Sequence, residues 1–134
     1  DKLYLGSNVE SVGENTVHLG SNFSTLREIN VDPANKYLTA YKNVLYNIGD
    51  DAPYFIPSAI TRLELKPVKV IEKNFIYRLE NVEEIVFAEG TERIEAYAVE
   101  KCRNLRTVYV PASVTYMDKE AIYDCGDKVE VIRK

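Results

Sequence analysis

Apolar side chains recur in a fixed order along the C-terminal half of the chain. The segments 82–87 and 105–110 both read apolar-x-x-apolar-x-apolar, and further apolar positions follow each of them at matching distances. Several matches at one spacing indicate an internal repeat in which each copy forms one structural unit. Positions that match at a spacing of 23 residues include Phe87 and Val110, Ile94 and Met117, and Cys102 and Cys125.

The same pattern extends upstream with small departures. Residues 3–17 keep the offsets of residues 108–122, and residues 63–76 keep them with one residue deleted. A further copy of the strand pattern lies at 26–31, and a last copy begins at 128–132. The pattern predicts short strands near 3–5, 29–31, 63–65, 85–87, 108–110 and 129–131.

The repeat length and the alternation within each copy predict the fold. A period of 22 or 23 residues falls in the range of about 20–29 residues that is typical of leucine-rich repeats. The apolar-x-apolar part of each copy predicts a strand with one buried face, and the later Ile-x-x-x-Ala-Val part has helical spacing. We therefore expect an α/β solenoid, a short right-handed stack of parallel strands with helical turns opposite. It is expected to form a single domain over residues 1–134.

The stretch between the second and third predicted strands is longer than one repeat requires. Two aromatic, β-prone runs at 41–46 and 54–56 flank the turn residues Gly49-Asp50-Asp51. This arrangement predicts a β-hairpin inserted over about 35–57, with Pro57 ending its second strand or keeping it at an edge. An alternative makes 54–56 a strand of the coil, because Ile56 and the apolar residues after it keep the repeat offsets.

The last complete copy carries a resemblance to a known family. Residues 105–117, Ala121-Ile122 and Cys125 match the pattern Leu-x-x-Ile-x-Ile-Pro-x-x-Val-x-x-Ile-x-x-x-Ala-Phe-x-x-Cys. This pattern is that of the BspA-like leucine-rich-repeat family of bacterial surface and secreted proteins. The preceding copy departs from it at Ala88, where proline is usual, and residues 43–47 look like the family's Asp-Gly-Val-Leu-Tyr hairpin.

The resemblance covers nearly the whole chain, although the N-terminal copies have drifted from the pattern. It implies an extracellular or cell-surface location and a role in adhesion or ligand binding. It implies no catalytic residues.

Charge and hydropathy narrow the function classes further. The net charge is −4 and basic residues are scattered among acidic ones, which argues against a nucleic-acid partner. No apolar run approaches the about 20 residues of a membrane span. The chain opens within the repeat pattern, so we expect a processed or trimmed protein. The unfinished last copy is expected to pair with another molecule or with further residues.

Candidate catalytic and metal-binding residues are few. Cys102 and Cys125 occupy one repeat position, which favours a ladder of buried thiols, and a disulfide between adjacent coils is the open alternative. His18 is the only histidine and lies far along the chain from both cysteines. Turn chemistry explains Asp50-Asp51 better than calcium binding does. We therefore expect no enzyme activity, no cofactor and no metal.

The outward side chains of the predicted strands form a surface that we call the strand face. Solenoids commonly bind ligands on such an extended face, and Tyr and Arg are frequent anchors in interfaces. The strand-face candidates are Tyr4, Asn30, Glu64, Val86, Arg106, Tyr109 and Glu130, and the hairpin candidates are Tyr41, Tyr46 and Tyr54.

These observations predict a non-catalytic module that binds a protein, an extracellular-matrix component or a glycan through the strand face. Several alternatives stay open. The chain could be a structural spacer in a larger surface protein, with outward residues that are simply solvated, or it could be a carbohydrate-binding unit. The hairpin tyrosines could equally pack against the coil that the hairpin interrupts.

Overall fold

A computed structural model describes residues 2–10, 27–57, 59–126 and 128–133, and every regular element in these ranges is a strand. The chain divides into two compact units, Asp1–Ile60 and Thr61–Lys134. The expectation of a single domain over 1–134 stays a prediction. His18 and the predicted repeat positions between 12 and 26 lie outside the described residues.

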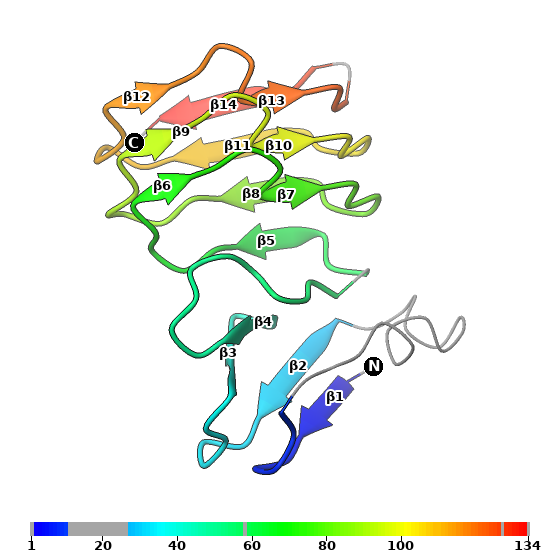
Figure 1. Cartoon of the computed structure of the whole chain (residues 1–134). Coiled ribbons are helices and arrows are strands. Elements are labelled where there is room, and N and C mark those ends of the chain that lie inside the picture. Colours follow the sequence, from blue (N-terminus) through cyan, green and yellow to red (C-terminus); the bar gives the residue numbers. More distant parts are fainter. Residues whose placement is uncertain (1, 11–26, 58, 127, 134) are drawn as a thin grey trace. The chain divides into compact units, whose positions relative to one another are not determined.

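The first unit contains a parallel pair of strands and an antiparallel hairpin (Figure 1). β1 (Lys2–Leu5) pairs in parallel with β2 (Glu28–Val31), which confirms the strands predicted near 3–5 and 29–31. β3 (Leu38–Tyr41) and β4 (Val44–Asn47) form the hairpin. The buried core of this unit consists of Leu5, Ile29, Leu38 and Leu45.

The hairpin is present, but its turn is not the predicted one. Lys42 and Asn43 connect the two strands with φ angles of 47° and 69°, the left-handed geometry of a type I′ turn. The pattern of aromatic runs missed this turn because Lys-Asn lacks the glycine that usually marks such turns, whereas the resemblance of residues 43–47 to the family's hairpin pointed to it. Phe55 instead forms a single antiparallel bridge with Leu45, so the alternative that made 54–56 a strand of the parallel coil is wrong.

The second unit is a stack of coils, each built from three short strands that belong to three separate parallel sheets. The β5 coil (62–83) contains β5 (Arg62–Glu64), β6 (Val70–Ile71) and β7 (Ile76–Tyr77). The β8 coil (84–106) contains β8 (Glu84–Val86), β9 (Arg93–Ile94) and β10 (Val99–Glu100). The β11 coil (107–129) contains β11 (Thr107–Val110), β12 (Tyr116–Met117) and β13 (Ile122–Tyr123), and β14 (Glu130–Arg133) follows it.

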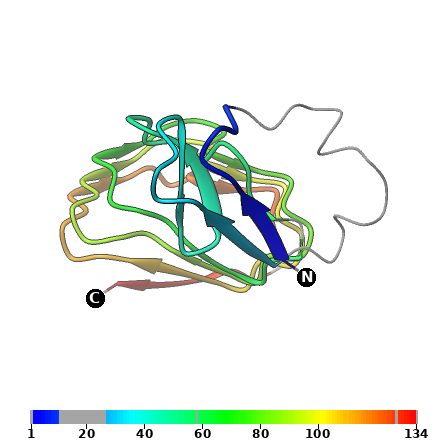
Figure 2. The same cartoon turned by 90° about the horizontal axis from the view of Figure 1, so that it is seen from below.

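Equivalent strands of successive coils lie beside one another. The sheet orders are β5-β8-β11-β14, β6-β9-β12 and β7-β10-β13, and Figure 1 shows them as three columns. Seen from below, the coils of residues 62–133 overlie one another (Figure 2). The stacked parallel strands confirm the solenoid prediction, while the handedness of the coil stays a prediction.

The predicted helical turns are wrong for the described residues. The Ile-x-x-x-Ala-Val part of the β8 coil forms two strands, β9 and β10, on either side of Tyr97, whose φ is 58°. A left-handed residue cannot continue a right-handed helix. The backbone bonds instead to the next coil, as where the Val99 N–H donates to the Ala121 carbonyl at 2.9 Å.

Inward side chains of each coil stack into rows that form the core of the second unit. Leu63, Ile85 and Val108 form one such row and are fully buried. Ala98 and Ala121, which occupy one repeat position, are also fully buried. The rows end at the β11 coil and β14, where the inward side chains Met117, Ile122 and Val131 are only partly covered.

Candidate functional site

Alternate side chains of the sheet β5-β8-β11-β14 point outward and form the strand face of the second unit. The pairing places Val86 beside Tyr109 on neighbouring parallel strands, as the repeat predicted. One outward row is Glu64, Val86, Tyr109 and Ile132, and the next is Arg62, Glu84, Thr107 and Glu130. Val86, Tyr109 and Ile132 therefore form an apolar strip beside a largely charged row.

Three outward side chains on successive coils hold one another in place. The Arg62 guanidinium donates to Glu84 Oε1 at 3.0 Å and lies 5.4 Å from the centroid of the Tyr109 ring. The Tyr109 hydroxyl donates to Glu84 Oε2 at 3.2 Å. Donation to the Glu84 carboxylate raises the pKa of Arg62. These contacts restrict the rotamers of all three side chains before any ligand arrives.

Two predicted strand-face residues occupy positions that differ from the central row. Arg106 precedes β11, and its side chain is 77% exposed and lies 3.9 Å from a carboxylate oxygen of Glu83. Glu130 pairs with Thr107, not with Tyr109. The last strand was predicted at 129–131, but it begins at Glu130 because the 23-residue spacing continues from Tyr109 to Ile132.

In the first unit, Tyr4 and Asn30 face outward as a cross-strand pair on β1 and β2. Tyr4 is 63% exposed, and its hydroxyl donates to Asp32 Oδ2 at 2.9 Å. This hydrogen bond raises the pKa of Tyr4, and the Asp32 carboxylate also accepts from the backbone N–H of Ala34, which lowers the pKa of Asp32. Tyr4 and Asn30 thus form a polar patch in which the Tyr4 side chain is held by its hydrogen bond to Asp32.

The hairpin tyrosines divide between core and surface. Tyr46 is fully buried, so its ring packs inside the first unit and does not form part of an outer surface. Tyr41 is half-buried, with the Lys42 ammonium 5.6 Å from its ring centroid. Tyr54 is 38% exposed. The packing alternative therefore describes Tyr46, while Tyr54 is accessible to a ligand.

The two other faces of the second unit carry exposed tyrosines that the sequence analysis did not single out. Tyr116 on β12 lies 4.4 Å from the Arg93 guanidinium, measured from ring centroid to Cζ. Tyr123 on β13 packs edge-on against Tyr97 with ring centroids 4.9 Å apart. Tyr77 on β7 is 43% exposed. The apolar spacing in this part of each coil predicted helical turns, and a helical turn does not show the alternation of inward and outward side chains that a strand shows.

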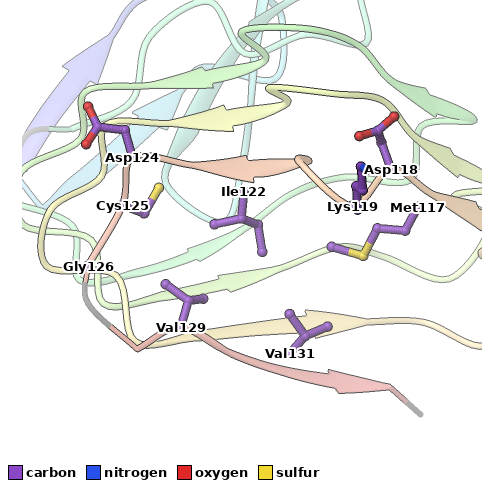
Figure 3. Close-up of a pocket in the computed structure, with 9 residues that line it drawn as sticks. All are labelled: Met117, Asp118, Lys119, Ile122, Asp124, Cys125, Gly126, Val129 and Val131. Carbon is purple, nitrogen blue, oxygen red and sulfur yellow. The ribbon is translucent and has the colours of Figure 1, made fainter.

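A cavity of about 370 Å³ opens at the end of the β11 coil (Figure 3). Apolar side chains of Met117, Ile122 and Val131 form part of its wall, and Asp118 and Lys119 add charges. These apolar residues are the partly covered ends of the core rows. The described residues that line it are Met117, Asp118, Lys119, Ile122, Asp124, Cys125, Gly126, Val129 and Val131.

Within the described ranges no group of three or more His, Cys, Asp or Glu side chains could hold a metal ion. The described part of the chain also holds no helix long and apolar enough to span a membrane. Both cysteines are free thiols, Cys102 buried and Cys125 partly exposed.

Parallel strands stacked at a 23-residue spacing, with apolar rows inside, define a β-solenoid of the leucine-rich-repeat class. A family model described as the BspA type leucine rich repeat region matches residues 1–128 in six copies. The chain therefore belongs to the BspA-type leucine-rich-repeat family, as the resemblance implied. No curated protein matches the chain.

Solved structures with a similar fold include the pneumococcal vaccine antigen PcpA, with 15% identity and a TM-score of 0.50 over 98% of this chain. A leucine-rich repeat protein from Eubacterium ventriosum matches 98% of the chain, with 16% identity and a TM-score of 0.46. A leucine rich cell surface protein from Faecalibacterium prausnitzii matches 99%, with 18% identity and a TM-score of 0.43. The chain spans 42%, 48% and 48% of these three proteins, respectively. At such identities the likeness concerns the fold alone.

Proposed function

We propose that this chain is a non-catalytic binding module of an exported or cell-surface bacterial protein. Its ligand is a protein, an extracellular-matrix component or a glycan, and it binds on the strand face of the second unit. Membership of the BspA-type family supports this proposal. The names of two of the solved structures, a vaccine antigen and a cell surface protein, are consistent with the proposed location.

The observation that carries the proposal is the held arrangement of Arg62, Glu84 and Tyr109. Aromatic and arginine side chains supply much of the binding energy at protein interfaces. The guanidinium and the ring are already fixed by the Glu84 carboxylate, so binding loses less side-chain entropy than it would with mobile anchors. Val86 and Ile132 flank Tyr109 in the same row and give the surface an apolar strip beside its charges.

Alanine substitution of the outward residues tests the strand face. The 134-residue chain would be screened against a glycan array and a panel of purified extracellular-matrix proteins, and the affinity for the strongest ligand would be measured. Tyr109→Ala and Arg106→Ala are each expected to weaken that affinity about tenfold or more, because an interface anchor contributes about 2 kcal/mol. Tyr109→Phe separates loss of the ring from loss of the hydroxyl.

Matched controls lie on another part of the same unit. Tyr123 and Arg103 are exposed, and neither belongs to the strand face, so Tyr123→Ala and Arg103→Ala are expected to leave the affinity unchanged. Circular dichroism would confirm that each variant is folded. Unchanged binding by both Tyr109→Ala and Arg106→Ala would remove the strand face as the site, and absence of any ligand would favour the spacer alternative.

A glycan-binding role on the other faces is a second candidate, and the exposed tyrosines favour it. Arg93 and Tyr116 form one aromatic and cationic pair, and Tyr97 and Tyr123 form an aromatic pair with both rings at the surface. Aromatic faces with polar neighbours suit sugar rings, which present both C–H and hydroxyl groups. If this candidate is correct, Tyr116→Ala and Tyr123→Ala abolish binding on the glycan array and Tyr109→Ala does not.

A further inference from the structure

Cys102 and Cys125 lie at equivalent positions of neighbouring coils. β10 and β13 pair in parallel with Val99 opposite Ile122, and the Lys101 N–H bonds to the Tyr123 carbonyl at 3.1 Å just beyond the paired residues. The register that this ladder sets places the two cysteines side by side. Neighbouring strands lie about 4.8 Å apart, within the Cα separation of about 4.4–6.8 Å that a disulfide spans.

The two thiols differ in their surroundings. Cys102 is fully buried, whereas Cys125 is partly exposed and lines the cavity at the end of the β11 coil (Figure 3). Cys102 Sγ is 3.8 Å from the Glu100 oxygen of its own coil. Cys125 Sγ is 3.4 Å from the Tyr123 oxygen of its own coil and 3.8 Å from the Val99 oxygen of the neighbouring coil. A small reagent in the cavity can therefore reach one thiol and not the other.

The two thiols are chemically unequal. The contact with the Cys102 thiol lowers the pKa of Cys125, and backbone N–H groups of Cys102 and Lys101 lower it further against the effect of burial. The contact with Cys125, together with burial, raises the pKa of Cys102. The thiolate is the nucleophilic form of cysteine. The more accessible thiol is thus also the more reactive one at neutral pH.

We propose that Cys125 is a site of oxidation by peroxides and that Cys102 resolves the oxidised thiol, so that a disulfide joins the β8 and β11 coils. This proposal is independent of ligand binding by the strand face. The two cysteines would then form a disulfide beside the cavity under oxidising conditions, in addition to packing in the core.

The chemistry takes two balanced steps. The Cys125 thiolate attacks one oxygen of hydrogen peroxide, the O–O bond breaks, and hydroxide leaves, which gives a sulfenic acid at Cys125. The Cys102 sulfur then attacks the Cys125 sulfur, the S–O bond breaks, and the Cys102 proton combines with the departing hydroxide to form water. Hydrogen peroxide is the oxidant, and the two thiols supply both electrons. Because these are the only cysteines in the chain, no internal thiol competes for the intermediate.

Alkylation kinetics test the unequal reactivity in the reduced 134-residue chain. With iodoacetamide at pH 7, Cys125 is expected to react at least about tenfold faster than Cys102, because it is accessible and more fully ionised. The pH profile for Cys125 is expected to have its midpoint below the free-thiol value of about 8.5, and in Cys102→Ala the midpoint should move up toward that value. Equal rates at the two cysteines, or a midpoint that does not move in the variant, would overturn the proposal.

Oxidation products test the resolving step. After hydrogen peroxide treatment, the wild-type protein should lose two hydrogen atoms in mass, stay monomeric on a non-reducing gel and show a Tm raised by roughly 5–10 °C. Cys102→Ala should instead accumulate a sulfenic acid at Cys125 that dimedone traps, and Cys125→Ala should give neither product. A dimedone adduct that persists in wild type, or a disulfide formed only between molecules, contradicts the mechanism. The wild-type result alone decides the disulfide if a variant fails to fold.

Discussion

Equivalent positions of successive coils stack into rows of similar side chains, so a polar residue within an apolar row needs a physical explanation. Val68, Thr91 and Val114 lie at equivalent positions of three coils and are all buried. Among the residues that the structure describes, the Thr91 hydroxyl oxygen has no hydrogen-bond partner. Threonine and valine have nearly the same shape, so the row accepts threonine sterically, but a buried hydroxyl without a partner costs free energy.

Thr91→Val is therefore expected to stabilise the protein by about 1 kcal/mol, because it removes an unsatisfied buried hydroxyl without opening a cavity. Urea denaturation followed by circular dichroism would measure the change in the free energy of unfolding. The matched control is Val114→Thr, which places a hydroxyl at the equivalent buried position of the next coil and should destabilise by about 1–3 kcal/mol. A destabilised Thr91→Val would show that the hydroxyl contributes to packing.

Exposed turns carry a second kind of residue-level effect. The Asp118 carboxylate accepts hydrogen bonds from the Glu120 N–H at 2.8 Å and from the Tyr116 hydroxyl at 2.9 Å, and both lower the pKa of Asp118. A carboxyl whose pKa is lower in the folded state stabilises the fold above its unfolded-state pKa of about 3.9. That contribution disappears as the pH falls through the folded-state pKa.

The stability difference between wild type and Asp118→Asn is accordingly expected to be largest near neutral pH and to shrink below about pH 4. Thermal melts of both proteins from neutral to acidic pH would follow it. Using the difference removes the titration of the other carboxylates, which both proteins share. A difference that stays constant with pH would mean that the charge of Asp118 has no part in holding this turn.

At the level of elements, the sequence predicted the strands of the strand face well and the rest of each coil poorly. The apolar-x-apolar triplets at 63–65, 85–87 and 108–110 correspond to β5, β8 and β11 within a residue or two, because alternation in a buried strand fixes which side chains face the core. The spacing of Ile94, Ala98 and Val99 fits either one helical turn or two strands joined by a bend. Tyr97 in a left-handed conformation decides for the bend, and no sequence rule requires tyrosine to adopt it.

The candidate site was predicted to a similar extent. Tyr109 and Val86 are neighbours on the strand face, as expected, because the repeat spacing determines which residues of successive coils stack. The contact of Arg62 with Tyr109 was not predicted, because it depends on side-chain reach across β8. The exposed tyrosines at 77, 116 and 123 were missed together with the strands that carry them.

The β3-β4 hairpin offers a test of its turn. Asn43 has a φ of 69°, and its side-chain oxygen accepts from the Ile29 N–H of β2 at 3.3 Å. Asn43→Ala is expected to cost about 1–3 kcal/mol, from left-handed strain and the lost hydrogen bond together. Asn43→Gly removes only the hydrogen bond and should cost less. Thermal denaturation would rank the two, and an equal cost would show that backbone strain is negligible in this turn.

On the scale of the whole molecule, each coil of the second unit is stabilised mainly by its neighbours. The β5 and β8 coils are each followed by another coil that covers their inward side chains. Leu63, Ile71, Ile85 and Ile94 of these coils are fully buried. At the end of the stack, by contrast, the inward side chains Met117, Ile122 and Val131 are only partly covered and line the cavity. In a stack of repeats, stability is approximately a sum of contributions from each repeat and each interface between repeats.

The same substitution should therefore cost different amounts along the stack. Ile94→Ala in the β8 coil is expected to destabilise by about 3–4 kcal/mol, since the side chain is fully buried between coils. Ile122→Ala in the β11 coil should cost less than half as much, because the cavity already leaves one side of that isoleucine open. Equal losses in chemical denaturation would indicate that something covers the end of the stack in solution.

The three-sheet cross-section has a consequence for how this protein can change. Each coil of the second unit contributes one residue to each row of stacked side chains. Outward rows on one sheet share no residue with outward rows on another sheet. Placing the same residue at every twenty-third position would create an outward row of identical side chains that are about 4.8 Å apart. One side can therefore be rewritten for a new repeating ligand, such as a polymer with a similar period, while the interior and the remaining sides keep their original residues.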